Sequence, residues 1–384
     1  MNRKVRLFFA GDFCSTPSTS KISVSEELKD LIRSCDLRTV NFEVPLRPDA
    51  QMPPQKRKRF YQHDDAPEFL HGLGFNLFSL ANNHTFDWGT DGFLKTKAAL
   101  VDESFGAGTY EEAYQVKVVK VHGRKIGFMA LSYAAYTGVF NDVTCHEGLG
   151  CAYINDLRVN HDIIEAKKYV DYLFIIPHDG IEYIDIPLPE TIARYRDFID
   201  YGADGVIASH PHCPQGWEDY KGKPIFYSLG NFLFNSKDDY SFHSDLPHWY
   251  EGLCVVMTLD KRRISWEVVN TRNVDNVMIE VDRDDGRMAH DECLCGYIAN
   301  KEAYNQYFDG ICRDLGYTKF MTKIDCTFHP FSLQISADVL DKRLREHAES
   351  IDFTNDSAIE RILAHDGNRS FLLHSIKKHR KYKY

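Results

Sequence analysis

The feature that most constrains the fold is a set of five apolar runs, each ending in side chains that can bind a metal ion. These runs alternate with segments of helical periodicity, such as residues 24–35 and 189–202. The side chains at the ends of the runs are Asp12, Glu43, Asn83 with His84, His178, and His210 with His212. Because the carboxyl ends of strands in an α/β fold meet at one edge, where ligands usually bind, we expect these side chains to lie close together. The chain is therefore predicted to be an α/β protein with a site at that edge.

Three further segments alternate as β-hairpins do, at residues 114–133, 216–232 and 253–270. The first two are predicted to turn at His122-Gly123 and at Lys221-Gly222. Beyond about residue 270 the alternation stops, and the chain becomes charged and helical in pattern. We expect one domain over residues 1–270 and a mainly helical C-terminal extension over residues 271–384.

Composition narrows the classes of function. The chain has 384 residues, 43% of them hydrophobic, which is typical of a folded protein rather than a disordered one. Its formal net charge of -10 argues against a nucleic-acid partner, because neutralising phosphates requires a basic face. The ten cysteines show no regular framework and fit reduced thiols. A zinc site at Cys293, Cys295, Cys312 and Cys326 is disfavoured, since their spacing is not that of a usual finger.

The sequence also bears on location. No apolar segment approaches the roughly 20 residues of a membrane span. The first apolar run follows basic residues, as in a signal peptide, but it is short and Asp12 interrupts it. A first strand is the better interpretation, and a cytoplasmic location is the expectation that follows.

Each candidate ligand has an ordinary alternative. His210 and His212 share one face if the segment is extended, and histidines at this spacing commonly bind one metal or two neighbouring ones. They could equally be polar residues that begin a proline-rich turn. Asp12, which follows Gly11, could accept turn hydrogen bonds, and Asn82 is expected to be a turn residue.

Taken together, these donors suit a pair of divalent ions such as Mn, Fe or Zn. Two ions about 4 Å apart would hold a phosphoryl oxygen and lower the pKa of a bound water, which would be the nucleophile. In this interpretation His84 is the general acid for the leaving group, and Asp87 orients its ring.

At this point the residues resemble a known family, the capsule-synthesis CapA (poly-γ-glutamate capsule) family, which is similar to the calcineurin-like metallophosphoesterases. The stretches that carry the resemblance run in order from residue 6 to about residue 234, and they include NFEVPL, SLANNHTFDWGTDGF, HDGIEY and GADGVIASHPHCPQGW. The resemblance implies a metallophosphatase-like β-sandwich flanked by helices, in α/β/β/α layers, over residues 1–270.

The resemblance also implies roles for single residues. One metal would be held by Asp12, Glu43 and His212. The other would be held by Glu43, Asn83, His178 and His210, with Glu43 as the bridge. His84 matches the catalytic histidine, while Asn231 and Glu182 match residues near the substrate.

Two positions depart from the broader phosphoesterase pattern. Cys14 stands where the first motif usually has a histidine, and a buried apolar cysteine is the favoured interpretation. Glu43 stands where the bridging residue is usually an aspartate. A site that binds one metal tightly rather than two is therefore a realistic outcome.

Three functions remain open on the sequence. The first is a metal-dependent hydrolase acting on a phosphoester or a related bond in a surface polymer or its precursor. The second is a non-catalytic protein that binds metal or anionic polymer, the latter through the basic run at residues 56–59. The third is a metal-dependent amide hydrolase. The expected partner is an anionic or phosphorylated small molecule or a surface polymer, and the oligomeric state is open.

Overall fold

The computed structural model describes residues 3–49, 60–134, 138–140, 148–236, 246, 248–261, 263–313, 370–371 and 373–374. The chain forms two compact units, Met1–Ala299 and Asn300–Tyr384. The predicted boundary at residue 270 lies inside a strand, β16 (Arg263–Val274). A further strand, β17 (Met278–Val281), and the helix α8 (Asp285–Ala299) complete the first unit. The first unit therefore continues beyond the predicted domain.

The larger sheet of the first unit has nine strands in its described part, in the order β2-β17-β16-β15-β1-β3-β4-β5, with β14 also paired to β1. The strands not yet defined are β1 (Val5–Ser15), β2 (Ser23–Val24), β3 (Leu37–Phe42), β4 (Leu77–Ser79), β5 (Ser104–Phe105), β14 (Asn231–Asn235) and β15 (Glu251–Asp260). Strands β1, β3, β4 and β5 run parallel, so their carboxyl ends lie at one edge. Strands β15 and β16 form the predicted third hairpin.

The smaller sheet has six strands in the order β12-β13-β11-β10-β8-β7. They are β7 (Lys117–Val121), β8 (Arg124–Ser132), β10 (Tyr172–His178), β11 (Gly205–Ile207), β12 (Trp217–Tyr220) and β13 (Lys223–Phe226). Both predicted hairpins are confirmed: β7 pairs with β8 and β12 with β13. Their turn residues all have positive φ, between 50° and 79°, as two-residue hairpin turns require. A short ladder joins β6 (Ala107–Gly108) to β9 (Gly150–Cys151).

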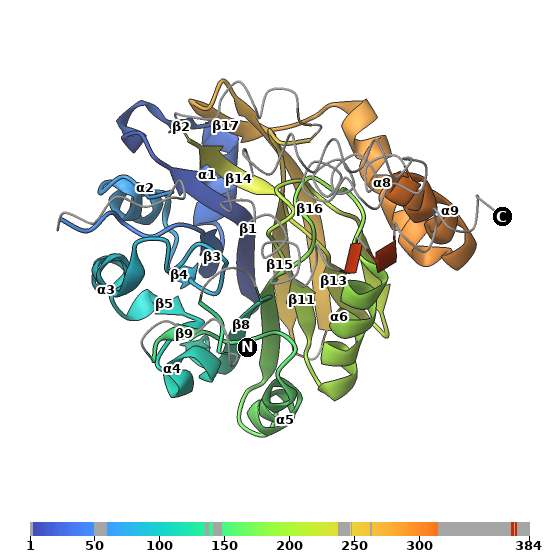
Figure 1. Cartoon of the computed structure of the whole chain (residues 1–384), viewed down its shortest axis with the longest axis horizontal. Helices are drawn as coiled ribbons and strands as arrows, with labels where there is room; N and C mark the ends of the chain where they lie inside the picture. The colour runs from blue at the N-terminus through green and yellow to red at the C-terminus, as the bar shows by residue number, and fades with distance from the viewer. Residues whose placement is uncertain are drawn as a thin grey trace, which may run out of the picture. The chain divides into compact units, whose positions relative to one another are not determined.

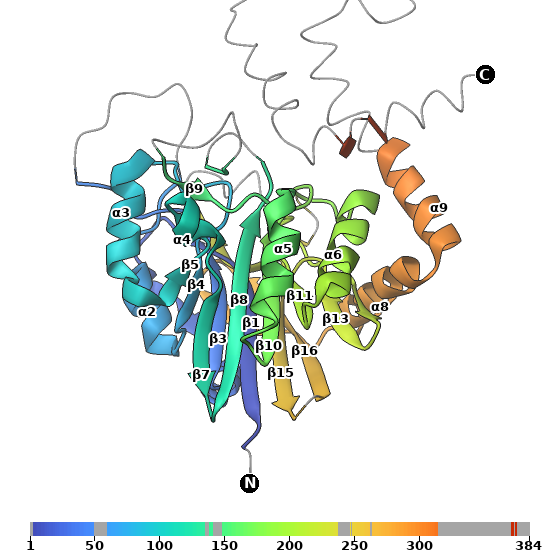
Figure 2. The ribbon, with the colours of Figure 1, turned by 90° about the horizontal axis from the view of Figure 1, so that it is seen from below.

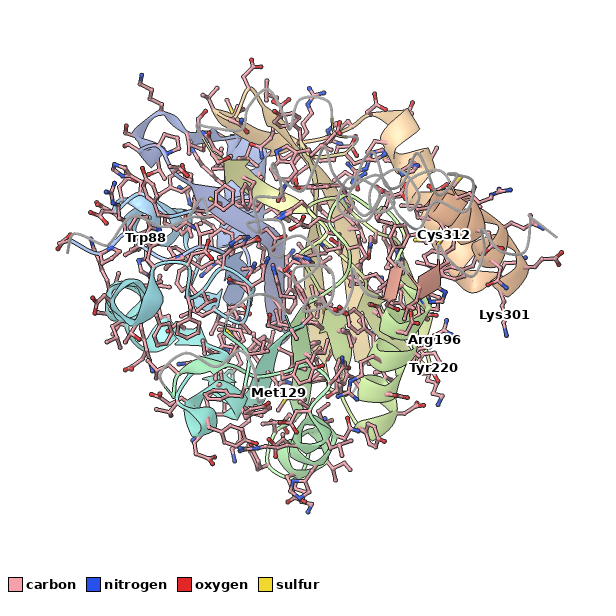
Figure 3. The ribbon with its side chains drawn as sticks, in the orientation of Figure 1. Trp88, Met129, Arg196, Tyr220, Lys301 and Cys312 are labelled. Carbon is pink, nitrogen blue, oxygen red and sulfur yellow. The ribbon has the colours of Figure 1, made fainter. Side chains whose placement is uncertain are left out.

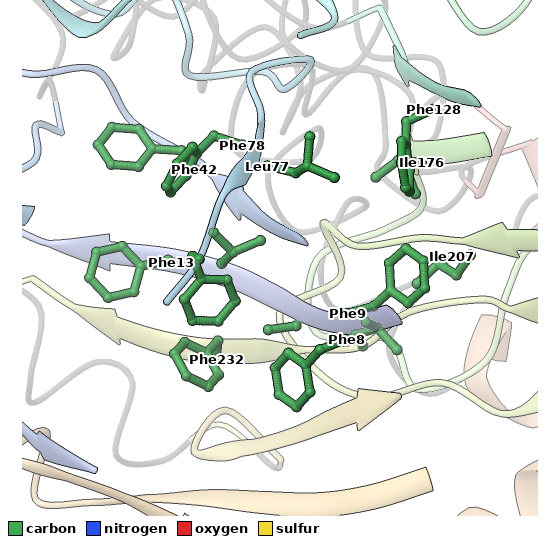
Figure 4. Packing of buried hydrophobic residues seen from close by; sticks show 14 of the residues in the cluster. Phe8, Phe9, Phe13, Phe42, Leu77, Phe78, Phe128, Ile176, Ile207 and Phe232 are labelled. Atoms are coloured by element: carbon green, nitrogen blue, oxygen red, sulfur yellow. The ribbon is translucent and has the colours of Figure 1, made fainter. Parts of the chain in front are cut away.

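The core lies between the two sheets. The ring of Phe9 on β1 lies 6.4 Å from that of Phe128 on β8 and 5.8 Å from that of Phe174 on β10. Phe8, the preceding residue on β1, points to the other face (Figure 4). Its ring centre lies 6.0 Å from that of Phe75. Because side chains alternate along a strand, one face of β1 packs against the second sheet and the other packs against helices.

Helices cover the outer faces of both sheets. They are α1 (Glu26–Arg33), α2 (Ala66–Leu73), α3 (Gly89–Ala99), α4 (Tyr110–Tyr114), α5 (Leu157–Ala166) and α6 (Pro189–Tyr201). Figures 1 and 2 show α2 and α3 beside the larger sheet, and α5 and α6 beside the smaller one. The predicted α/β fold, with two packed sheets flanked by helices, is confirmed.

Surface side chains tie the edge of the smaller sheet to a helix. Arg196 of α6 donates two hydrogen bonds to the carboxylate of Glu218 on β12, at 2.8 and 2.7 Å. Its guanidinium also lies 5.3 Å from the ring centre of Tyr220, and Figure 3 shows the two side chains next to each other. A bidentate arginine pair of this kind fixes orientation as well as adding energy.

The second unit is described over its first helix, α9 (Lys301–Ile311), and over four residues near the end of the chain. The side chain of Asn300 caps α9 by accepting hydrogen bonds from the backbone of Glu302 and Ala303. Helices α8 and α9 agree with the prediction of helices after residue 270. Residues 314–369, about half of the predicted extension, and the basic run at 56–59 lie outside the described residues.

Candidate metal centre

Strands of both sheets deliver the predicted ligands to one place. Asp12 lies near the end of β1, Glu43 directly follows β3, and His178 is the last residue of β10. His210 and His212 follow β11. Asp12, Glu43 and His210 are fully buried, and the exposed fractions of His178 and His212 are 1% and 4%. The sequence predicts convergence at the edge of one sheet, whereas the structure forms the group where the edges of two sheets meet.

The backbone at this place is tightly constrained. The backbone N–H of Asp12 donates to the carbonyl of Gly230 at 2.9 Å. A Cβ atom on Gly11 would lie 1.9 Å from the same carbonyl oxygen, so only glycine fits there. His210 and His212 have φ values of +110° and +58°, which L-residues adopt rarely. Strained residues of this kind cluster at functional sites, where the surrounding structure holds them in place.

Asp12 and Glu43 are two buried carboxylates surrounded by imidazoles. His212 lies between them, with Nδ1 3.5 Å from Asp12 Oδ2 and Nε2 3.5 Å from Glu43 Oε1. His178 lies 3.7 Å from an oxygen of Asp12 and 3.8 Å from an oxygen of Glu43. Within the described part of the chain, no lysine or arginine pairs with either carboxylate, and no hydrogen bond reaches the oxygens of Glu43. Burial, and then the negative charge of Asp12, raise the pKa of Glu43 well above its ordinary value.

Asn83 and His210 extend the group on the side of His178. His178 Nε2 lies 2.8 Å from Asn83 Oδ1 and 3.1 Å from His210 Nδ1. The backbone N–H of His210 donates to Asp12 Oδ2 at 3.1 Å. The structure thus brings all six predicted metal ligands together.

The donor atoms form two groups that share Glu43. One contains Glu43, His210 and His212, and the other contains Asp12, Glu43 and His178; within each group the ligand atoms lie within 4.8 Å of one another. A shared Glu43 fits the bridging role that the resemblance implies. The groups divide the histidines differently from the predicted assignment, which stays a prediction.

His84 and Asp87 lie beside this group and contact each other. His84 Nδ1 lies 2.8 Å from Asp87 Oδ2, and the ring of Phe60 packs edge-on against His84 at 5.4 Å. Asn82 holds the turn, because its side-chain oxygen accepts from the backbone N–H of His84 at 3.0 Å and from the hydroxyl of Thr85 at 2.9 Å. The pairing of His84 with Asp87 has the geometry that the sequence interpretation expects.

The two predicted substrate residues differ in their contacts. Asn231 lies with Oδ1 3.0 Å from His212 Nδ1, and its amide nitrogen donates to the carbonyl of Trp249 at 3.0 Å. It therefore orients a candidate metal ligand. Glu182 is partly exposed, and its negative charge helps to raise the pKa of Glu43.

Cys14 is fully buried, and its side chain packs with Val44, Phe234 and Trp249. Burial, and then the charge of Glu43, raise the pKa of the Cys14 thiol well above its ordinary value. The neutral, apolar cysteine of the sequence interpretation fits this environment.

The sequence interpretation missed two residues. Asn41 donates from Nδ2 to Asp12 Oδ1 at 2.7 Å, and the same nitrogen lies 3.2 Å from His178 Nδ1. Its position two residues before Glu43, on the same face of the chain, was an available signal. Tyr133 follows β8, and its ring lies 4.5 Å from that of His210. Because β8 also runs parallel to β10, the rule of strand ends applies to Tyr133 as well.

The chain is similar in sequence to known proteins. A model of the family described as bacterial capsule synthesis protein PGA_cap matches residues 6–236, more than half of the chain. The chain belongs to this bacterial capsule synthesis family. It is 26% identical over 252 residues to the capsule biosynthesis protein CapA of Bacillus anthracis, which covers 61% of each chain. It is 27% identical over 226 residues to the PGA biosynthesis protein CapA of Bacillus subtilis, covering 56% of this chain and 57% of the relative. The matches thus span about three fifths of these relatives.

Two solved structures align with much of the chain at low sequence identity. A phosphatase from Mycoplasma pneumoniae aligns over 75% of this chain and 98% of its own, with 15% identity and a TM-score of 0.46. A 5′-nucleotidase from Candida albicans aligns over 69% of this chain and 50% of its own, with 9% identity and a TM-score of 0.41. In the described residues, no helix is both long and apolar enough to cross a membrane.

Proposed function

We propose that this member of the capsule synthesis family is a metal-dependent hydrolase that cleaves a phosphoester or a related bond during the synthesis of a capsule polymer. The observation that supports this most is that Asp12 and Glu43 are buried next to each other. No lysine or arginine of the described residues pairs with either carboxylate. Burying a carboxylate costs several kcal/mol unless a positive charge compensates. Divalent cations bound at this place would supply that charge.

The donor set fits such cations. It combines carboxylate, imidazole and amide groups, which together suit Mn, Fe or Zn. The residues that would hold the ions are Asp12, Glu43, Asn83, His178, His210 and His212. Two divalent ions, when bound, polarise a phosphoryl oxygen and make water a nucleophile at neutral pH.

The remaining residues orient groups and move a proton. Asp87 accepts at Nδ1 of His84, which leaves Nε2 of His84 to donate a proton to the leaving group. Asn231 fixes the ring of His212, and Asn41 fixes Asp12 and His178. Outer-shell contacts of this kind set the orientation and basicity of metal ligands.

The substrate class is proposed from the relatives. The two Bacillus proteins are named for biosynthesis of capsule and of PGA. We therefore propose an anionic surface polymer or its phosphorylated precursor as the substrate of this chain. A cytoplasmic location stays a prediction.

A second candidate function is a protein that binds metal and anionic polymer without catalysis. Cys14 favours it, because a buried neutral thiol stands where the broader phosphoesterase pattern has a histidine donor. An amide hydrolase acting on γ-glutamyl bonds would use the same metal centre, so the substrate panel must include it.

The test combines metal content with turnover. Purified protein is analysed for Mn, Fe and Zn, then assayed with a phosphoester panel and with γ-glutamyl amides. The variant His84→Gln is expected to keep its metal and to lose about 10²–10⁴-fold in turnover, because it removes the proton donor. His161→Gln is the matched control, since that histidine is 71% exposed on α5 and lies outside the site.

Three results would count against this function. Full turnover by His84→Gln would refute the assigned proton donor. Metal without turnover on any substrate of the panel would favour the binding protein. Absence of metal, both as purified and after incubation with manganese or zinc, would contradict the metal centre itself.

A further inference from the structure

A second group of metal-competent side chains lies outside the centre described above. It consists of Asp185 from the segment after β10, His248 from the segment before β15, and His290 from α8. Their ligand atoms lie within 4.8 Å of one another. All three residues belong to the first unit of the chain.

The facing atoms of His290 and Asp185 lie at the spacing of two ligands on one ion. His290 Nε2 lies 3.3 Å from Asp185 Oδ2. This nitrogen is nevertheless buried without a hydrogen-bond partner in the described residues. Two atoms that each lie about 2 Å from one tetrahedral ion are about 3.3 Å apart, which matches the observed spacing.

The second histidine strengthens this interpretation. The rings of His248 and His290 are nearly parallel, at 6°, with their centres 4.5 Å apart. The stacking therefore brings a second imidazole, a common metal ligand, to the same place as the first. A plain pair between His290 and Asp185 does not require a second imidazole stacked on the first.

The group also has the supporting contacts of a metal site. His248 Nδ1 lies 2.6 Å from Glu251 Oε2, which leaves Nε2 of His248 for an ion. Glu251 in turn accepts from Arg287 Nη1 at 2.7 Å. The charge of Arg287 is balanced by Glu251 and by Asp291, whose carboxylate lies 3.1 Å from Arg287 Nε. A carboxylate that orients a histidine in this way is the usual outer shell of a bound metal.

Access and a further ligand are available. A cavity of about 520 Å³ is lined by His248, His290, Glu251 and Arg287, among others. A cavity of this size admits water, which commonly completes zinc coordination when the protein supplies three ligands.

We propose that Asp185, His248 and His290 form a site for a single Zn²⁺ ion, separate from the centre at Asp12 and Glu43. Two imidazoles and one carboxylate are ligands that zinc accepts in tetrahedral sites. This site is independent of the hydrolase function proposed above.

The position of the ion gives it a structural role. Tyr183, two residues before Asp185, stacks on His212 at 6.3 Å, and Trp249, next to His248, lies 5.1 Å from the same ring. Tyr183 and His248 both have positive φ, at 68° and 62°, so both segments are held in uncommon conformations. An ion at this site connects α8 to the two segments that carry Tyr183 and Trp249, the aromatic neighbours of His212.

The test uses cobalt(II) chloride as a spectroscopic substitute for zinc. The full chain is freed of metal with a chelator, and the double variant His210→Ala/His212→Ala is used to disable the main centre. Cobalt is then titrated while visible absorption and bound equivalents are measured. We expect one equivalent with the intense absorption of a tetrahedral site, and its loss when His290→Ala or Asp185→Asn is added. His161→Ala is the control for removal of an exposed histidine.

A second measurement serves if the double variant does not fold. The zinc content per chain is compared between the wild-type protein and the single variant His290→Ala, and we expect one equivalent fewer in the variant. Equal metal content with and without His290 would overturn the proposed site and leave an ion pair. Because the His210/His212 variant tests the main centre separately, failure of one site is distinguishable from failure of the other.

Discussion

Replacement of Glu43 by glutamine is the most informative single change in this protein. The substitution keeps the shape of the side chain and removes its charge. In the ion-free protein Glu43 is fully buried, and burial and Asp12 raise its pKa above 4.5. The folded state therefore binds more protons than the unfolded state between pH 4.5 and the folded pKa, and its stability falls as pH rises through that window. We expect Glu43→Gln to stabilise the protein when no metal is bound.

The size of the effect has an upper bound. At pH 7.5, about 3 units above the ordinary pKa of Glu43, protonating this side chain on folding costs at most about 4 kcal/mol. The amide of the new glutamine leaves buried polar groups without hydrogen bonds. This loss offsets about 1–3 kcal/mol of the stabilisation that comes from removing the charge. The net stabilisation of the ion-free protein is therefore expected to be at most about 1–3 kcal/mol, and each kcal/mol raises Tm by roughly 2–4 °C.

The assay is thermal unfolding at pH 7.5, in chelator and then in manganese or zinc. The unchanged protein is expected to gain about 2.7 kcal/mol at a metal concentration 100 times Kd, while Glu43→Gln gains much less. Glu165→Gln, an exposed residue paired with Lys168, is the matched control and should leave Tm unchanged in both conditions. The reasoning is refuted if Glu43→Gln destabilises the ion-free protein, or if it responds to metal as the unchanged protein does.

Two further predictions test the packing and the helix caps. Gly11→Ala is expected to lower the free energy of unfolding, measured by chemical denaturation, by at least about 2 kcal/mol, because its Cβ would overlap Gly230. Gly72→Ala is the control: a Cβ there meets open space, so the change should be neutral or stabilising by up to about 1 kcal/mol. Glu112 forms a capping box with Thr109, and its pKa is lowered by hydrogen bonds from Lys97 and from the backbone of Thr109. Thr109→Ala should cost about 1 kcal/mol at pH 7. Glu112→Gln should destabilise only above the lowered pKa, so its difference from the unchanged protein should vanish as pH falls through that value. An equal cost of Gly11→Ala and Gly72→Ala, or a pH-independent effect of Glu112→Gln, would contradict these arguments.

The local pattern of the sequence predicted most of the fold of the first unit. The hairpin turn at His122-Gly123 and the helix α1 lie where the turn residues and the helical periodicity of residues 24–35 indicated. Such elements depend on contacts between near neighbours, which a sequence shows directly. The end of the first unit was less visible, because β17 pairs with β2, a strand far away in the chain, and the sequence has no local stop signal that marks this pairing.

For the site, the sequence determined which residues could act, and the structure determined how they meet. Polar side chains at the ends of apolar runs pointed to Asp12, Glu43 and the histidines, because burying a polar group without a hydrogen-bond or charge partner is costly. The sequence could not show that the edges of two sheets meet at Glu43, since this depends on packing between Phe9 and the second sheet.

Tertiary structure alone decided the second group of ligands. Asp185, His248 and His290 are spread over more than one hundred residues, and none ends an apolar run or belongs to a motif. Their proximity results from the packing of α8 against other segments of the first unit, a long-range contact that leaves no periodicity in the chain. Turns and helix ends depend on neighbouring residues, so the sequence predicts them, whereas a site built from three distant segments exists only once the chain has folded.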